Sequence, residues 1–107
     1  MPDTNQIVKS IEEQSKLLAE KLFHQFTQQA VSDTRDFLAQ SRADIERWAG
    51  ELARQEIDQD DLASLIRGEK DLAEMRALKQ AGLAQVTLDT FTNGVLDIAI
   101  SAIVAAV

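Results

Sequence analysis

The last third of the chain, from Asp71 to Val107, carries apolar residues on two sides of a predicted helix. At about 100° per residue, two sets of positions fall nearly opposite each other. One set is Leu72, Met75, Leu83 and Val86, and the other is Ala73, Ala77, Ala81, Ala84, Leu88, Phe91, Val95, Ala99, Ala102 and Ala106. A helix on the surface of a monomer needs only one apolar stripe. Two stripes must be covered from both sides, which favours assembly.

Helical periodicity also covers the first half of the chain. Asp3, followed three residues later by Gln6, is a capping pattern that predicts the start of a helix. The apolar positions of this helix are Ile7, Ile11, Leu18, Leu22, Phe26 and Ala30. The following segment, 34–57, repeats the pattern with Phe37, Leu38, Ile45, Trp48, Leu52 and Ala53.

Two interpretations of residues 5–56 stay open. Ser32, Asp33 and Thr34 are suitable N-cap residues, which favours a break near Ser32 and two separate helices. No glycine or proline forces that break, and an unbroken helix would be roughly 75 Å long, too extended to bury its stripe within one chain. A stripe with eleven-residue spacing crosses the region; its members are Ser15, Phe26, Phe37 and Trp48.

Residue 58 begins a clearer signal. Asp58 is a good N-cap residue with Asp61 at the third helical position, which predicts a short helix. Gly68 either ends that helix in a left-handed conformation or lies within a longer helix at a cost of about 1 kcal/mol. A final helix is expected to follow from about Glu69.

The pair Asn93-Gly94 suggests an alternative, because Asn-Gly between β-branched runs is a hairpin signal. The helical stripe continues across this pair, and a lone two-stranded hairpin is only marginally stable. A helix is therefore favoured, with a kink or local break at Gly94 allowed.

These patterns predict one all-α domain over residues 1–107. The helices are expected at about 5–31, 33–56, 59–67 and 69–106, as antiparallel amphipathic helices, three to four of them or a long helical hairpin. A composition with four glycines, one proline and 45% hydrophobic residues agrees with long helices. The two apolar sides of the last helix predict that the chain forms an oligomeric helical bundle, with a dimer as the first choice.

Charge and cysteine content exclude several classes of function. The net charge is −7, and the eleven basic residues never form a block, which argues against nucleic-acid binding. The absence of cysteine excludes disulfides, thiolate metal sites and cysteine nucleophiles. The first residues lack a basic region followed by an apolar stretch, so no secretory signal is expected and a cytoplasmic location is predicted.

Candidate chemistry is sparse. His24 lies one helical turn after Glu20, but a metal site in a helical bundle needs further ligands from other helices. Most acidic residues have a basic neighbour three or four positions away, as in Glu12–Lys16, which is typical of a solvated helix flank. No serine lies in a nucleophile elbow, and no glycine-rich phosphate loop occurs. We therefore predict no catalytic, cofactor-binding or metal-binding residue, and no cofactor.

The tail from Val95 to Val107 offers a membrane hypothesis. As a helix, residues 90–107 would span about 27 Å, nearly the thickness of a bilayer core. Asn93, Asp97 and Ser101 form a polar stripe within it, and no aromatic or basic residue anchors either end. A contact with protein is therefore favoured over a membrane span.

The expected function is that of a non-enzymatic, oligomeric helical interaction or structural protein. Its partner would be a second copy or another protein bound through the C-terminal helix. The predicted interface residues are Ala73, Ala77, Ala81, Ala84, Leu88, Phe91, Val95, Ile98, Ala99 and Ala102. The alternative is a peripheral lipid-surface or membrane-associated protein that uses the apolar C-terminal helix, and the third hypothesis is a carboxylate-dependent helical enzyme.

Overall fold

The computed structural model describes residues 3–107, which are almost entirely helical and contain no strand. The elements are α1 (Thr4–Phe23), η1 (His24–Phe26), α2 (Thr27–Ala53), α3 (Gln59–Arg67), η2 (Gly68–Leu72), α4 (Arg76–Gln80) and α5 (Gln85–Ala106), where η marks a 3₁₀ helix. The prediction of an all-α fold is confirmed.

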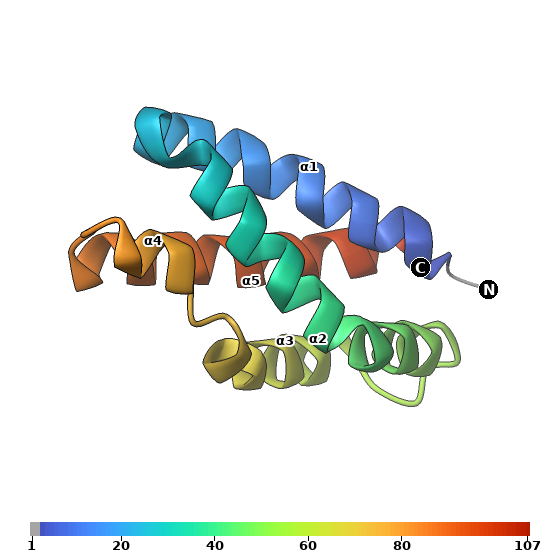
Figure 1. The fold of residues 1–107 in the computed structure, drawn as a ribbon. Helices are drawn as coiled ribbons and strands as arrows, with labels where there is room; N and C mark the ends of the chain where they lie inside the picture. Colours follow the sequence, from blue (N-terminus) through green and yellow to red (C-terminus); the bar gives the residue numbers. More distant parts are fainter. Residues whose placement is uncertain (1–2) are drawn as a thin grey trace.

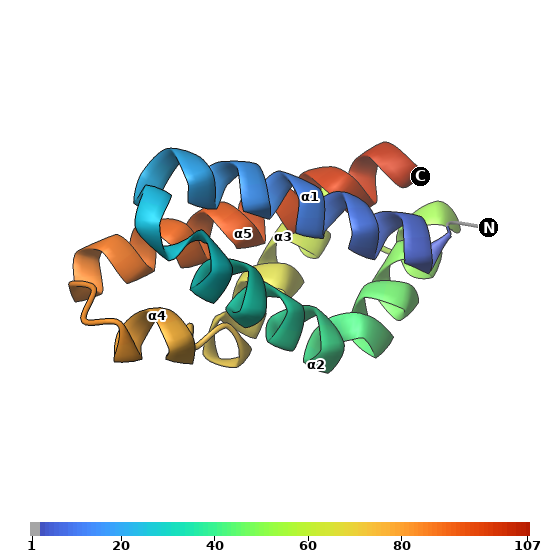
Figure 2. The same ribbon diagram turned by 45° about the horizontal axis from the view of Figure 1, so that its top comes forward.

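The helices form an elongated bundle of 43 × 22 × 20 Å. α1 and α5 lie side by side and run in opposite directions, and α2 crosses in front of them (Figure 1). α3 packs against α5, and the short α4 packs against α2 on the side away from α1 (Figure 2). The two ends of the chain lie at the same end of the bundle (Figure 1).

One continuous apolar core lies between the helices. Phe91 of α5 is fully buried at its centre, and its ring meets that of Phe23 edge to face, with centroids 5.2 Å apart. Every longer helix contributes to this core; its largest members include Ile7, Ile11, Phe37, Ile45, Leu62, Ile66, Leu78, Val95, Leu96 and Ile103. A single chain therefore buries most of the apolar positions identified in the sequence.

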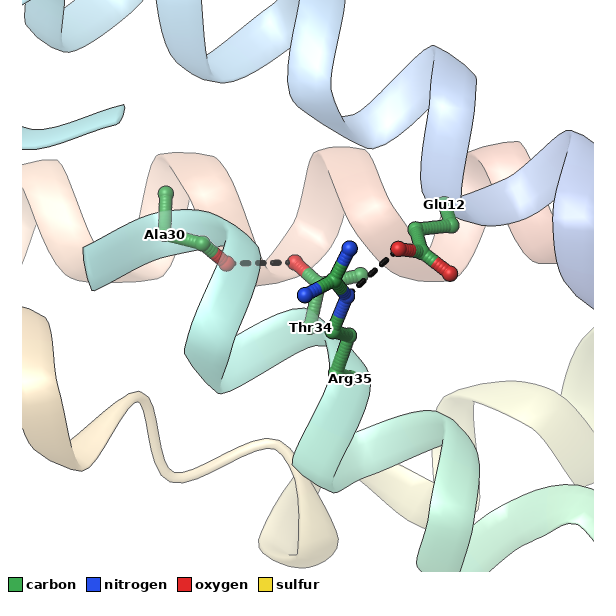
Figure 3. Close-up of polar contacts among 4 residues, drawn as sticks. All are labelled: Glu12, Ala30, Thr34 and Arg35. Carbon is green, nitrogen blue, oxygen red and sulfur yellow. Dashed lines mark hydrogen bonds and ion pairs between the residues drawn. The ribbon is translucent and has the colours of Figure 1, made fainter. Parts of the chain in front are cut away.

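The predicted break near Ser32 is wrong, because Ser32 lies inside α2. Its neighbours make other contacts. The carboxylate of Asp33 binds backbone amides of α4, and the Thr34 hydroxyl donates to the carbonyl oxygen of Ala30 at 2.8 Å, within the same helix (Figure 3). The residues expected to cap a new helix are thus engaged elsewhere, and α2 continues through them.

The first helix ends instead at η1, so the predicted bounds 5–31 and 33–56 are wrong. His24 adopts a left-handed backbone with φ of +46°, a conformation that costs a non-glycine residue about 1–2 kcal/mol. The Thr27 hydroxyl donates to the His24 carbonyl oxygen at 3.1 Å. This turn folds α2 back onto α1, which buries apolar surface that an unbroken helix would leave in water.

The predicted single helix over 69–106 is also wrong. Met75 is left-handed with φ of +52°, Gly82 has φ of +91°, and Ala84 is extended. These residues divide the segment into η2, α4 and α5. Gly68 does not adopt the left-handed conformation expected of a helix-ending glycine, because its φ is −65° and the chain continues directly into η2.

The helix with two apolar sides therefore does not form. Of the set expected on one side, Met75 is buried, Leu72 and Leu83 are half-buried, and Val86 is 77% exposed. Folding the segment back on itself lets one chain cover residues that a straight helix would present in opposite directions.

The local capping signals were predicted correctly. Asp3 accepts hydrogen bonds from the amides of Asn5 at 3.0 Å and Gln6 at 3.4 Å. Asp58 and Asp61 form a reciprocal capping box, with N–O distances of 2.7 and 3.1 Å. Both caps use side chains within three residues of the amides they bind, which is why sequence spacing alone identifies them.

α5 runs without interruption through Asn93 and Gly94, so the hairpin alternative is excluded. Gly94 lies where α1 approaches α5 most closely. A Cβ atom at this position would lie only 2.5 Å from a terminal methyl group of Leu18. The glycine therefore serves the packing of two helices and not a turn.

Candidate functional site

The predicted interface residues are mostly located in the core of the single chain. Six of the ten are buried: Ala73, Leu88, Phe91, Val95, Ala99 and Ala102. The others are Ala77, Ala81 and Ile98, which are half-buried, and Ala84, which is exposed. Contacts with α1, α2 and α3 already cover the buried members, so these residues are not available to a second copy of the folded chain.

This placement changes the result expected for a larger residue at Ala99, which is 0% exposed. Ala99→Leu should overpack the core and reduce the free energy of unfolding by about 1–3 kcal/mol. Urea unfolding followed by circular dichroism should show this loss equally at low and high protein concentration. Ser101→Leu, on the exposed face of the same helix, is the matched control. A loss that disappears at high concentration would instead indicate an interface between copies.

Large apolar side chains remain exposed at one end of the bundle. Leu17 is 64% exposed, Leu22 39% and Val86 77%. Leu17 and Leu22 belong to the last turns of α1, and Val86 to the first turn of α5, which lie at the same end of the molecule (Figure 2). We call these three residues the α1–α5 end surface.

Residues 68–80, which comprise η2 and α4, separate two polar hollows. A cleft of about 550 Å³ lies between this segment and α5, and a crevice of about 100 Å³ lies between it and α2. Asp71, Glu74 and Arg76 line both. The wider cleft brings acidic and basic side chains together; it is lined by Lys70, Asp71, Ala73, Glu74, Arg76, Lys79, Gln85, Leu88, Asp89 and Thr92.

Asp33 holds one end of this segment. Its side chain is only 5% exposed, and its two carboxylate oxygens accept hydrogen bonds from the amides of Ala77 and Leu78, each at 2.9 Å. These amides belong to the first turn of α4, which has no cap from its own chain neighbours. Asp33 therefore caps a helix that lies more than forty residues away in the sequence.

Glu69 holds the other end. It is 9% exposed and faces Asp44 of α2, whose carboxylate also pairs with Arg47 at 3.2 Å. Burial raises the pKa of Glu69 to about 7, and the hydrogen bond to Asp44 and the negative charge of Asp44 add to that increase. The positive charge of Arg47 opposes it. Two carboxyl groups thus meet at a buried contact, where one shared proton removes their repulsion.

The remaining polar residues show no arrangement for catalysis or metal binding. Over residues 3–107, no three histidine or carboxylate groups converge as metal ligands would. His24 and Glu20 are both exposed. Arg35 of α2 donates to Glu12 of α1 at 2.5 Å (Figure 3). Such pairs between exposed side chains tether helices and contribute about 0–1 kcal/mol each.

Sequence reasoning missed both Asp33 and Glu69 as structural residues. Asp33 had a signal, because it lies in a run of capping residues, but the helix it caps is remote in sequence. Glu69 had none, since an acid beside Lys70 and Asp71 has the pattern of a solvated surface. Only the fold shows that Glu69 is buried against a second acid.

Comparisons with known proteins found no relative of this chain: no family model, no curated protein and no solved structure matches it.

Proposed function

We propose that this protein is a non-enzymatic helical interaction protein whose partner is a second copy of itself, bound through the α1–α5 end surface. The observation that carries the proposal is the exposure of Leu17, Leu22 and Val86 at one end of a bundle whose core is otherwise closed. Exposed apolar side chains that gather in one place are typical of protein contacts.

The charge of α1 supports a second copy as the partner. The chain has a net charge of −7, so two copies repel each other over most of their surface. α1 is an exception, because it has no net charge. Its charged residues are Lys9, Lys16 and Lys21 with Glu12, Glu13 and Glu20. A two-fold contact presents the same surface twice, and a neutral apolar surface of mixed charge is self-complementary in that arrangement.

Sedimentation equilibrium at micromolar concentration tests the proposal. The parent protein should have twice the chain mass of 11.8 kDa. Leu17→Glu and Val86→Glu should each give the mass of a single chain, because a charge buried in an apolar contact is costly. Both residues are more than half exposed, so the fold and its circular dichroism should be retained.

Ser101→Glu is the matched control, since it adds the same charge to an exposed position of α5 outside the surface. This variant should remain dimeric. A parent protein that sediments as a single chain, or a dimer that survives both glutamate variants, would contradict the proposed contact.

A lipid-bound state is the second candidate. Within residues 3–107, α5 is the one helix long and apolar enough to cross a membrane by length and composition. Insertion would require Phe91, Val95 and Ala99 to leave the core, whereas its exposed face carries Asn93 and Asp97. Co-sedimentation with liposomes, measured on the same samples, separates the two candidates: pelleting of the parent protein would favour lipid, and its absence would favour the protein contact.

A further inference from the structure

The segment 68–80 is held to α2 at two points by carboxyl groups. Asp33 binds amides at the start of α4, and Asp44 meets Glu69 in η2. Asp33 and Asp44 are eleven residues apart, which corresponds to about three turns and places them on the same side of α2. The same helix face therefore secures both ends of the segment.

The two contacts differ in their chemistry. At the α4 end, a carboxylate accepts from two backbone amides, a contact that is complete when Asp33 is ionised. At the η2 end, two acids face each other with Glu69 almost fully buried. That contact is favourable only while one of the two carboxyl groups keeps its proton, because two carboxylates so close together repel.

We propose that the contact between Glu69 and Asp44 is a pH-sensitive clasp, which holds η2 against α2 while a proton is shared and loosens η2 when that proton leaves. The Asp33 contact persists, so the segment hinges about the start of α4. Met75, left-handed with φ of +52°, lies at this junction. Because Asp71 and Glu74 line both the cleft beside α5 and the crevice beside α2, movement of η2 changes the shape of both.

The charged surroundings of Glu69 come from three helices. On α2 they are Asp44, which favours the protonated form, and Arg47, which favours the ionised form. Arg67 at the end of α3 and Asp97 of α5 pair with each other at 3.5 Å. Burial and Asp44 outweigh Arg47, and the pKa of Glu69 rises to about 7.

The direction of the pH dependence follows from this increase. Glu69 has an ordinary pKa of 4.5 when η2 is released and about 7 when the clasp is closed. Between these values the closed state binds more protons. The stabilisation of the closed state is therefore complete below pH 4.5, decreases as the pH rises, and is lost above about pH 7.

Hydrogen exchange of the full chain, reported as protection factors, tests the clasp. From pH 6 to pH 8, the amides of residues 69–74 should lose protection by about three- to tenfold, the lower figure allowing for solvent screening. The amides of Ala77 and Leu78 and those of α1 should keep theirs. Equal protection of 69–74 at both pH values, or an equal loss throughout α4, would overturn the proposal.

Two variants and a control sharpen the test. Glu69→Gln is neutral at both pH values and should retain protection at pH 8. Asp44→Asn removes the opposing charge and should move the midpoint of the transition to lower pH. Asp71→Asn, an exposed acid of the same segment, should behave as the parent. A transition that persists unchanged in Glu69→Gln, or that disappears in Asp71→Asn, would assign the effect to a different group and refute the clasp.

Discussion

Replacing Asp33 by alanine is expected to reduce the free energy of unfolding by about 2–4 kcal/mol. The substitution removes two hydrogen bonds to a carboxylate, each worth about 1.5–3 kcal/mol, and relaxation of the short α4 recovers part of the loss. The amides of Ala77 and Leu78 would be left without an acceptor in a buried place. Urea denaturation followed by circular dichroism measures the difference.

Two further variants separate capping from charge. Asp33→Asn keeps one acceptor oxygen, so its loss should be about half as large, on the order of 1–2 kcal/mol. Asp36→Ala removes an exposed acid from the same helix and should change stability by no more than about 0.5 kcal/mol. If Asp36→Ala proved as costly as Asp33→Ala, the capping role of Asp33 would be refuted.

Truncation of Phe91 should have a still larger effect on the core. Phe91 is 0% exposed and packs edge to face on Phe23, so Phe91→Ala should cost about 3–5 kcal/mol. The loss combines the transfer of the ring out of the core with the cavity that it leaves. A variant this destabilised is best measured by urea denaturation at low temperature, with the parent protein under the same conditions.

A double-mutant cycle with Phe23→Ala tests the contact between the rings. The two substitutions together should cost less than the sum of the single losses, by about 0.5–1.5 kcal/mol for an aromatic pair. Asn93→Ala, at an exposed position of α5, is the control and should change stability by at most about 0.5 kcal/mol. Strictly additive losses would show that α1 and α5 are not joined through these rings.

Local signals in the sequence predicted local features well. The caps at Asp3 and Asp58 act through amides two or three residues away, so spacing alone identifies them. The apolar positions of the first half of the chain, such as Ile11, Phe37 and Ile45, are buried as their periodicity indicates. Helix over the pair Asn93-Gly94 was also predicted correctly, because the apolar stripe on both sides outweighed the turn signal.

Features that depend on distant residues could not be predicted in this way. Asp33 was interpreted as a cap for its own segment, but it caps a helix that begins at Arg76. Glu69 has the sequence environment of a solvated acid and is nevertheless buried against Asp44. In both cases the deciding partner is remote in sequence, and spacing along the chain carries no information about it.

The sequence by itself determined the helical class of this protein, the local caps and the residues that must be removed from water. The tertiary structure decided where the helices end. At His24 and Met75 the chain adopts left-handed backbone without glycine, at about 1–2 kcal/mol each. Burial of apolar side chains outweighs this cost, at roughly 25 cal/mol per Å² removed from water. Straight helices would have left that surface exposed, so two apolar stripes that suggested a partner were covered largely by the chain itself.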